Sequence, residues 1–155
     1  MALEEKIKLS ALLPAQRIFL LRDPASKDGV LGQLLRELCP DGGALDRREV
    51  QRQIAEREKG MSTTLDTGLA IPHVRLEELE QFEAALAVLP QGLPDPAAHK
   101  EIKVLFLLLS PARPAFFQKH LQVLGLLAQT FTPELIARLG ACTTAAEAAQ
   151  ILADK

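Results

Sequence analysis

The side chain best placed to do chemistry in this sequence is the imidazole of His73. It ends an apolar run in the segment TGLAIPHVR (67–75), directly after Ile71 and Pro72. Proline fixes its own φ and biases the residue before it to an extended backbone, so the imidazole should be held stiffly. A neutral imidazole keeps one unprotonated nitrogen and is therefore a competent nucleophile near neutral pH. The same position also suits an ordinary surface or capping histidine, and the segment alone leaves both interpretations open.

A second histidine, His120, falls inside the predicted helix 114–131, next to apolar positions. We expect it at the margin of the apolar stripe of that helix, facing the sheet. Two imidazoles at an apolar margin could share a phosphoryl group, since one ring can accept it while the other donates a hydrogen bond. The third histidine, His99, lies in a proline-rich stretch that offers no such support.

Two other kinds of site can be weighed against this one. A zinc site would need Cys, Asp or Glu ligands near the two histidines, and the spacing supplies none. A Ser-His-Asp triad is poorly supported, because the chain has no G-x-S-x-G segment. We therefore predict neither a metal nor another cofactor.

The composition narrows the class of protein. The chain has 155 residues, 48% of them apolar, which suits a single domain over residues 1–155. The 18 basic and 20 acidic residues leave a net charge of −2, so nothing favours a nucleic-acid partner. No apolar run reaches about 18 residues, which predicts no membrane insertion. Cys39 and Cys142 lie far apart and are expected as free thiols in a reducing cytoplasm.

Apolar runs and turn signals alternate along the chain. Strands are expected at the runs 17–22, 82–89 and 102–110, with a further short strand at His73. Helices are expected after capping residues, which are Ser26 or Asp23, Asp46, Thr132 and Thr144. The stretch PQGLPDPAAHKE (90–101) contains three prolines and is predicted to be a loop. This order favours an α/β fold, a three-layer αβα sandwich whose mixed sheet of about 4–5 strands is flanked by helices.

The predicted helix 114–131 contains apolar residues that recur at intervals of four and three positions. This spacing places them on one face of a helix, and we expect that face to be buried. The residues of this face are Phe117, Leu121, Leu124, Ala128 and Phe131.

Four segments follow one another in a characteristic order. They are the Arg57-Glu58 pair, the loop 62–68, the run Ala70-Ile71-Pro72-His73, and His120-Leu121 followed by Leu124. In this order they resemble the type 2 enzyme IIA domain of the bacterial phosphoenolpyruvate:sugar phosphotransferase system, in its fructose, mannitol and nitrogen-regulatory variants. The earlier segment SKDGVLGQLLREL (26–38) also resembles the first helix of that family. The resemblance thus covers about residues 7–152, nearly the whole chain.

The resemblance implies a function as well as a fold. Members of the family are cytoplasmic phosphocarriers, in which the small protein HPr gives a phosphoryl group to the histidine of the Ala-Ile-Pro-His run. That histidine passes the group to a IIB partner. Here His73 would be the acceptor, through Nε2, and His120 would donate to the phosphoryl oxygens or orient the ring. Arg57 would supply positive charge, and Ser62 and Thr63 would offer hydroxyl donors.

One loop departs from the family pattern. Where the family usually has S-T-G-I-G-N-G, this chain has STTLDTG at 62–68, which lacks two glycines and places Asp66 near the expected phosphoryl group. The departure motivates an alternative: a regulatory binding module of the same fold, in which phosphotransfer is weakened or lost. Retention of both His73 and His120 favours the carrier. The carrier function predicts that the side chains of His73 and His120 lie within roughly 3–6 Å of each other.

Overall fold

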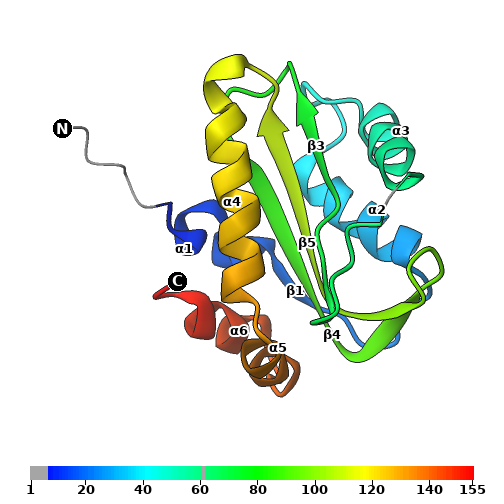
Figure 1. Cartoon of the computed structure of the whole chain (residues 1–155), viewed down its shortest axis with the longest axis vertical. Helices are drawn as coiled ribbons and strands as arrows, with labels where there is room; N and C mark the ends of the chain where they lie inside the picture. The colour runs from blue at the N-terminus through cyan, green and yellow to red at the C-terminus, as the bar shows by residue number, and fades with distance from the viewer. Residues whose placement is uncertain (1–6, 61) are drawn as a thin grey trace.

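The molecule is organised by a mixed sheet of five strands (Figure 1). The computed structural model describes residues 7–60 and 62–155, so residues 1–6 and 61 of the predicted domain 1–155 lie outside the described residues. The strands are β1 (Ile18–Leu20), β2 (Leu69–Ala70), β3 (His73–Leu76), β4 (Glu83–Asp95) and β5 (Lys100–Pro111). Their order is β1-β4-β5-β2, and β3 also pairs with β5. Only the β4–β5 pair is antiparallel among these pairs of the described residues.

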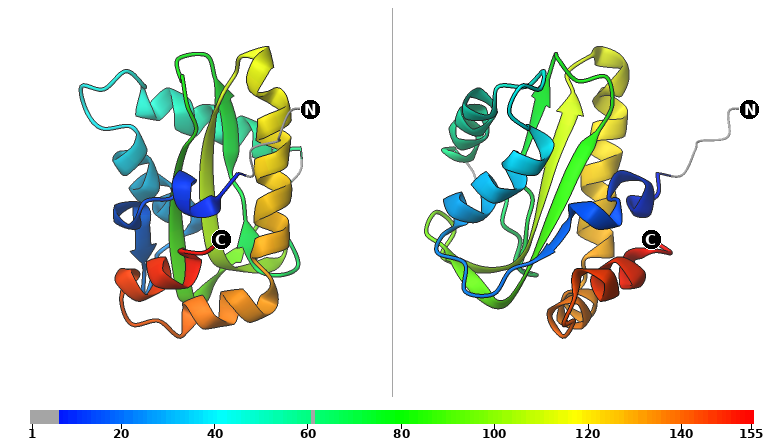
Figure 2. Two further views of the ribbon diagram at one scale, coloured as in Figure 1. Left: turned by 90° about the vertical axis from the view of Figure 1, so that its left-hand side faces the viewer. Right: turned by 180° about the vertical axis from the view of Figure 1, so that it is seen from behind.

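Helices cover both faces of the sheet (Figure 2). α2 (Lys27–Leu38) and α3 (Arg47–Glu58) lie on one face. α4 (Phe117–Thr130) lies along the other face, together with α1 (Leu9–Leu12), α5 (Pro133–Gly140) and α6 (Ala145–Leu152). Short 3-10 turns at Ala15–Arg17 and Pro114–Phe116 precede β1 and α4. The three-layer αβα sandwich predicted from the sequence is confirmed.

Alternate residues of β5 supply two separate cores. The even-numbered residues from Val104 to Leu108 pack on the α4 side of the sheet. The odd-numbered residues from Leu105 to Leu109 pack against α2 and α3. Successive side chains of a strand point to opposite faces, so a strand covered on both faces is apolar throughout. The predicted central strand at 102–110 is confirmed, and it joins the two helical layers.

The helices begin at the capping residues that the sequence indicates. The Ser26 hydroxyl accepts a hydrogen bond from a backbone N–H of the first turn of α2 at 3.0 Å, so Ser26 rather than Asp23 is the cap. Asp46, Thr132 and Thr144 cap α3, α5 and α6 in the same way. The cap of α3 fixes where this helix starts, and α3 then packs against β3 at the edge of the sheet.

The predicted loop at 90–101 is wrong, because β4 and β5 continue through most of it as a long hairpin. β4 extends to Asp95 and β5 begins at Lys100. Proline is tolerated here since β4 pairs with β1 only up to Val88 and is an edge strand beyond it. The register shifts after Val88, and Gly92 lies in the shift with a φ of 74°, which glycine adopts without strain. The hairpin matters because it carries Asp95 toward the site.

The buried face of α4 also differs from the prediction. The buried residues of the helix are His120, Val123 and Leu127. Of the predicted stripe only Phe131 is buried, whereas Phe117 and Leu121 are 47% and 51% exposed. α4 carries apolar residues around much of its circumference, so their spacing does not identify the face that packs on the sheet. His120 faces the sheet as predicted, but from within the buried face rather than from its margin.

Candidate active site

His73 stands at the start of β3, and its side chain is only 8% exposed. Its Nδ1 lies 2.7 Å from the backbone carbonyl oxygen of Ile71. A carbonyl oxygen only accepts hydrogen bonds, so Nδ1 carries the ring proton and Nε2 keeps its lone pair. The Ile-Pro-His segment therefore sets the tautomer that a nucleophilic Nε2 requires.

Arg57 reaches this lone pair from the last turn of α3. Its Nε donates to Nε2 of His73 at 3.3 Å. Arg57 is otherwise exposed, so its guanidinium can also meet an anion that arrives at His73. A guanidinium presents several donors in a fixed fork, which matches the geometry of a phosphoryl group. The structure thus brings Arg57 and His73 together, as the sequence predicts.

His120 meets His73 from the opposite side, on α4. The ring centroids are 5.5 Å apart with an interplanar angle of 50°, in agreement with the predicted proximity. The His120 side chain is 2% exposed, and its Nδ1 lies 2.7 Å from the hydroxyl oxygen of Ser110 on β5. We call His73 and His120 the histidine pair. The roles of the two rings stay predictions, whereas their contact is a feature of the fold.

Burial and neighbouring cations keep both imidazoles neutral. Burial lowers the pKa of His73 below its ordinary value, an effect that the hydrogen bond to the Ile71 carbonyl opposes and the charge of Arg57 reinforces. Burial, together with the charges of His73, Arg75 and Arg57, lowers the pKa of His120 to about 4. A neutral ring is the form of His73 that can act as a nucleophile.

The hydroxyl groups of Ser62 and Thr63 contact carboxylates. Ser62 Oγ donates to Asp95 at 3.0 Å, and Thr63 Oγ1 donates to Glu58 at 2.5 Å. Lys27 Nζ joins the two carboxylates, at 3.1 Å from Asp95 and 3.2 Å from Glu58. We call Lys27, Glu58, Ser62, Thr63, Thr64 and Asp95 the carboxylate cluster, since the Thr64 hydroxyl also donates to Asp95. Ser62 and Thr63 therefore stand near the site without a hydrogen bond to either imidazole.

Asp66 and His99 form no hydrogen bond with the histidine pair within the described residues. Asp66 forms an ion pair with Lys100 at 3.0 Å, and its side chain is 92% exposed. This pairing compensates the charge of Asp66 at the surface. His99 is exposed and has a positive φ, in the turn between β4 and β5.

Sequence reasoning missed Ser110, Asp95 and Arg75. Ser110 ends the apolar run of β5, and a hydroxyl at a position that should face α4 could have signalled a polar contact. Asp95 lies in the stretch 90–101, whose prolines predicted a loop. Arg75 follows His73 by two positions on β3, and its guanidinium lies 5.1 Å from the centroid of the Phe117 ring. It also donates to the carbonyl oxygen of Arg113 at 3.1 Å.

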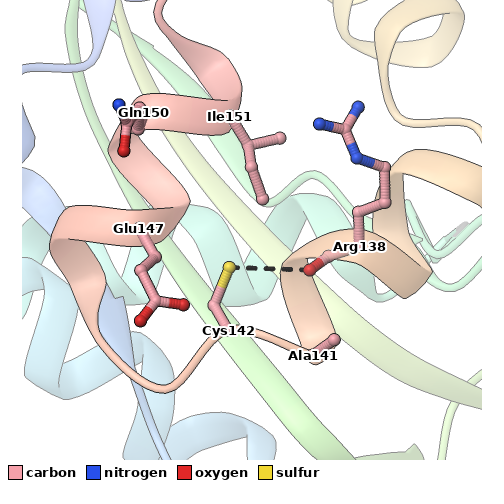
Figure 3. Close-up of a pocket in the computed structure, with 6 residues that line it drawn as sticks. All are labelled: Arg138, Ala141, Cys142, Glu147, Gln150 and Ile151. Atoms are coloured by element: carbon pink, nitrogen blue, oxygen red, sulfur yellow. Dashed lines mark hydrogen bonds between the residues drawn. The ribbon is translucent and has the colours of Figure 1, made fainter.

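A hollow between α5 and α6, lined by Cys142, Arg138 and Glu147 among others, contains no residue of the histidine pair (Figure 3). Cys142 donates through Sγ to the carbonyl oxygen of Arg138 at 3.5 Å. Burial raises the pKa of this thiol, and the charge of Glu147 raises it further, which makes Cys142 a poor nucleophile. Cys142 and Cys39 are both free, as predicted, and the structure shows that both are buried.

Residues 7–60 and 62–155 contain neither a cluster of metal ligands nor a membrane-spanning helix. In this part of the chain, no group of three or more His, Cys, Asp or Glu side chains is arranged to hold a metal ion. None of its helices has the length and apolar character needed to cross a membrane.

The sequence profile of the family "Phosphoenolpyruvate-dependent sugar phosphotransferase system, EIIA 2" matches residues 11–155. The chain belongs to this family. Membership confirms the resemblance seen in the Ala-Ile-Pro-His run and the His120 helix.

A named relative and two solved structures support this assignment. The chain is 31% identical over 128 residues to a protein named "PTS system fructose-specific EIIA component" from Haloferax volcanii, covering 81% of each chain. It is also similar to the nitrogen regulatory protein IIA-Ntr from Neisseria meningitidis, with a TM-score of 0.75, 30% identity, and 92% and 97% of the two chains covered. IIA mannitol from Escherichia coli shares the fold, with a TM-score of 0.68, 22% identity, and 89% and 96% covered.

Proposed function

We propose that this chain is a cytoplasmic phosphocarrier that accepts a phosphoryl group from an HPr-like protein on Nε2 of His73 and passes it to a IIB component. The observation that carries the proposal is the arrangement of the His73 ring. Its Nδ1 is tied to the Ile71 carbonyl, while Nε2 keeps a lone pair that only Arg57 contacts among the described residues. Membership of the EIIA 2 family supports the same reaction.

The proposed transfer exchanges one bond to phosphorus for another. Nε2 of His73 attacks the phosphorus atom, the bond between phosphorus and the donor breaks, and its electron pair stays with the donor. The His73 ring gains positive charge, which the Ile71 carbonyl stabilises because it accepts the Nδ1 hydrogen bond. Transfer to the IIB component reverses these changes. Such a reaction depends on positioning and charge stabilisation, which the buried site supplies.

Arg57 has two successive tasks in this mechanism. In the unphosphorylated chain its Nε donates to the lone pair that must attack. We expect the exposed guanidinium to move from Nε2 to the phosphoryl oxygens as the phosphoryl group arrives. His120 donates to the same oxygens from the other side. Ser62 and Thr63 would have to turn from their carboxylates to make the phosphate contacts proposed for them.

The partner proteins would approach along the first turns of α4. Phe117 and Leu121, the two exposed large apolar side chains of the described residues, lie on this helix on either side of His120 in sequence. Exposed apolar side chains near a reactive group favour a protein partner, because their burial stabilises a complex. We propose that the HPr-like donor and the IIB component both use this surface.

Labelling from phosphoenolpyruvate tests the proposal. With enzyme I and HPr present, the wild-type protein should gain one acid-labile, base-stable phosphoryl group, and His73→Ala should gain none. His120→Ala should still accept the group, but should pass it on slowly. His99→Asn is the matched control, because it removes an exposed histidine and asparagine tolerates the positive φ at this position.

Two results would contradict the carrier. Label that persists in His73→Ala would exclude His73 as the acceptor. A wild-type protein that stays unlabelled, while a standard enzyme IIA is fully labelled, would favour the regulatory binding module instead. The observation that favours this alternative is the loop 62–64, whose hydroxyl groups are all engaged within the carboxylate cluster.

A further inference from the structure

Ser110 carries a hydroxyl group at the end of a row of apolar side chains on β5. On the face of β5 that α4 covers, the preceding residues are Val104, Phe106 and Leu108, and all are fully buried. Ser110 is fully buried as well. A buried hydroxyl destabilises the fold unless it forms a hydrogen bond, so its single side-chain contact should explain why it is there.

The Ser110 hydroxyl contacts the His120 ring at Nδ1, with 2.7 Å between the two atoms. Within the described residues, Ser110 Oγ has no second hydrogen-bond partner and His120 Nε2 has none at all. If Nδ1 donated, the hydroxyl proton would remain buried without an acceptor, which carries a large desolvation penalty. The Ser110 hydroxyl and Nδ1 are both satisfied only if Ser110 donates and Nδ1 accepts. The ring proton then lies on Nε2, which is not among the fully buried side-chain atoms left without a partner.

We propose that Ser110 is a positioning residue that holds His120 in the tautomer protonated at Nε2, so that His120 donates a hydrogen bond to the phosphoryl group on His73. This inference rests on the proposed function. Ser110 itself touches neither the phosphoryl group nor a partner protein, because the His120 ring lies between the hydroxyl and the site. It acts only through the orientation and protonation of that ring.

The histidine pair would then carry opposite tautomers for a simple reason. The Ile71 carbonyl can only accept, which places the proton of His73 on Nδ1. The Ser110 hydroxyl can donate, which places the proton of His120 on Nε2. The ring centroids are 5.5 Å apart, so these tautomers give one ring an Nε2 lone pair and the neighbouring ring an Nε2–H. A nucleophile and a donor to the transferred group need this arrangement.

The tautomers can be measured without any phosphotransfer. Long-range proton–nitrogen NMR spectra of isotope-labelled full-length protein near neutral pH distinguish protonated from unprotonated ring nitrogens. We expect His73 to be protonated at Nδ1 and His120 at Nε2. In Ser110→Ala the His120 ring should become a mixture of tautomers, while His73 should be unchanged. A wild-type His120 protonated at Nδ1 would overturn the proposal.

Kinetics supply the second readout. Ser110→Ala should lower kcat for phosphoryl transfer about 10-fold, less than the roughly 100-fold effect of removing a stabilising donor outright. KM for the donor should stay unchanged, because Ser110 is buried. Ser110→Thr keeps a hydroxyl and suits a strand, so it should restore most of the rate. Ser10→Ala is the control, since it removes a hydroxyl that contacts only the backbone of Lys155. Thermal melts establish that each variant is folded.

Failure of this inference is distinguishable from failure of the proposed function. If Ser110→Ala folds, is labelled and transfers at the wild-type rate, Ser110 has no positioning role, although the carrier function stands. If the wild-type protein takes no label, the carrier function fails, and the wild-type tautomer spectrum still decides whether Ser110 fixes the His120 ring. A loss of rate that Ser110→Thr does not restore would also contradict the proposal.

Discussion

The carboxylate cluster is partly buried and the histidine pair is buried, and their hydrogen bonds are completed in opposite ways. In the cluster, Asp95 accepts hydrogen bonds from Lys27, Ser62, Thr64 and the backbone of Ala97. In the histidine pair, each Nδ1 has a partner inside the fold. Each Nε2 is left to the exposed Arg57 or has no partner among the described residues.

This difference distinguishes polar groups that stabilise the fold from polar groups that are available to bind a ligand. A saturated network fixes the elements that contribute to it, here α2, the end of α3, the loop at 62–64 and the β4–β5 hairpin. A ring nitrogen without a fixed partner is available to a ligand. The family resemblance assigns the hydroxyl groups of Ser62 and Thr63 to phosphate binding, but in this structure they belong to the saturated network.

The largest effect on stability is expected at Asp95. Asp95→Ala should destabilise the fold by about 3–5 kcal/mol, because it leaves the buried Thr64 hydroxyl and the partly buried Lys27 and Ser62 without their acceptor. Asp66→Ala is the matched control: its ion pair with Lys100 is exposed, so the change should stay within about 1 kcal/mol. Urea unfolding measures both. Equal effects of the two substitutions would show that the carboxylate cluster does not stabilise the fold.

Acid should destabilise the fold through His120. Its pKa is about 4 in the folded chain against 6.5 unfolded, so the unfolded state binds the proton first as the pH falls. Stability from this group is complete above pH 6.5 and is lost between pH 6.5 and about 4, by about 3 kcal/mol in total. Urea unfolding across this range checks the slope.

His120→Gln should flatten that slope, because glutamine does not titrate. His99→Asn, at an exposed position, should leave the slope as in the wild type. Asp95 affects stability over a lower pH range. Burial raises its pKa, but hydrogen bonds from Thr64 and Lys27 hold the pKa at about 2, so the stabilisation that Asp95 provides is lost only below pH 3.8. An unchanged slope in His120→Gln would mean that the histidine pair does not resist protonation.

Arg57→Ala should slow phosphoryl acceptance roughly 100-fold, about 2.7 kcal/mol, because the transferred group loses a charged donor. Arg57→Lys should recover only part of the rate, since an ammonium lacks the fork of donors. The stability of both variants should match the wild type, because the side chain is exposed. Single-turnover labelling measures the rates. Wild-type rates in Arg57→Ala would remove Arg57 from the mechanism.

The smallest effect is expected at the exposed face of α4. Leu121→Ser should raise KM for the HPr-like donor about fivefold, or about 1 kcal/mol, with kcat unchanged. Gln129→Ser is the control, because it places the same residue at an exposed polar position of the same helix. Steady-state phosphorylation with varied donor concentration separates KM from kcat. Equal KM values for the two variants would place the docking surface elsewhere.

Much of the fold was predictable because its signals are local. The caps at Ser26, Asp46 and Thr144 each depend on a few neighbouring residues, and the run at 102–110 is apolar at nearly every position. The hairpin at 90–101 was not predictable in this way. Its prolines are allowed only because β4 has lost its second neighbour there, and that is a property of the sheet.

The sequence by itself determined the candidate nucleophile. Pro72 and the Ile71 carbonyl act within three consecutive residues, so the stiffness and the tautomer of His73 arise locally. The order of the Arg57, Ala-Ile-Pro-His and His120 segments likewise identified the family before any contact was known.

Only the tertiary structure decided what surrounds this candidate nucleophile. The buried face of α4 was chosen by packing on the sheet, which placed His120 inside and left Phe117 and Leu121 exposed. The partners of Ser62 and of the His120 ring lie on other elements, Asp95 at the end of β4 and Ser110 on β5. Such contacts depend on which strands are neighbours and which face each helix turns inward, and no local pattern of residues encodes either.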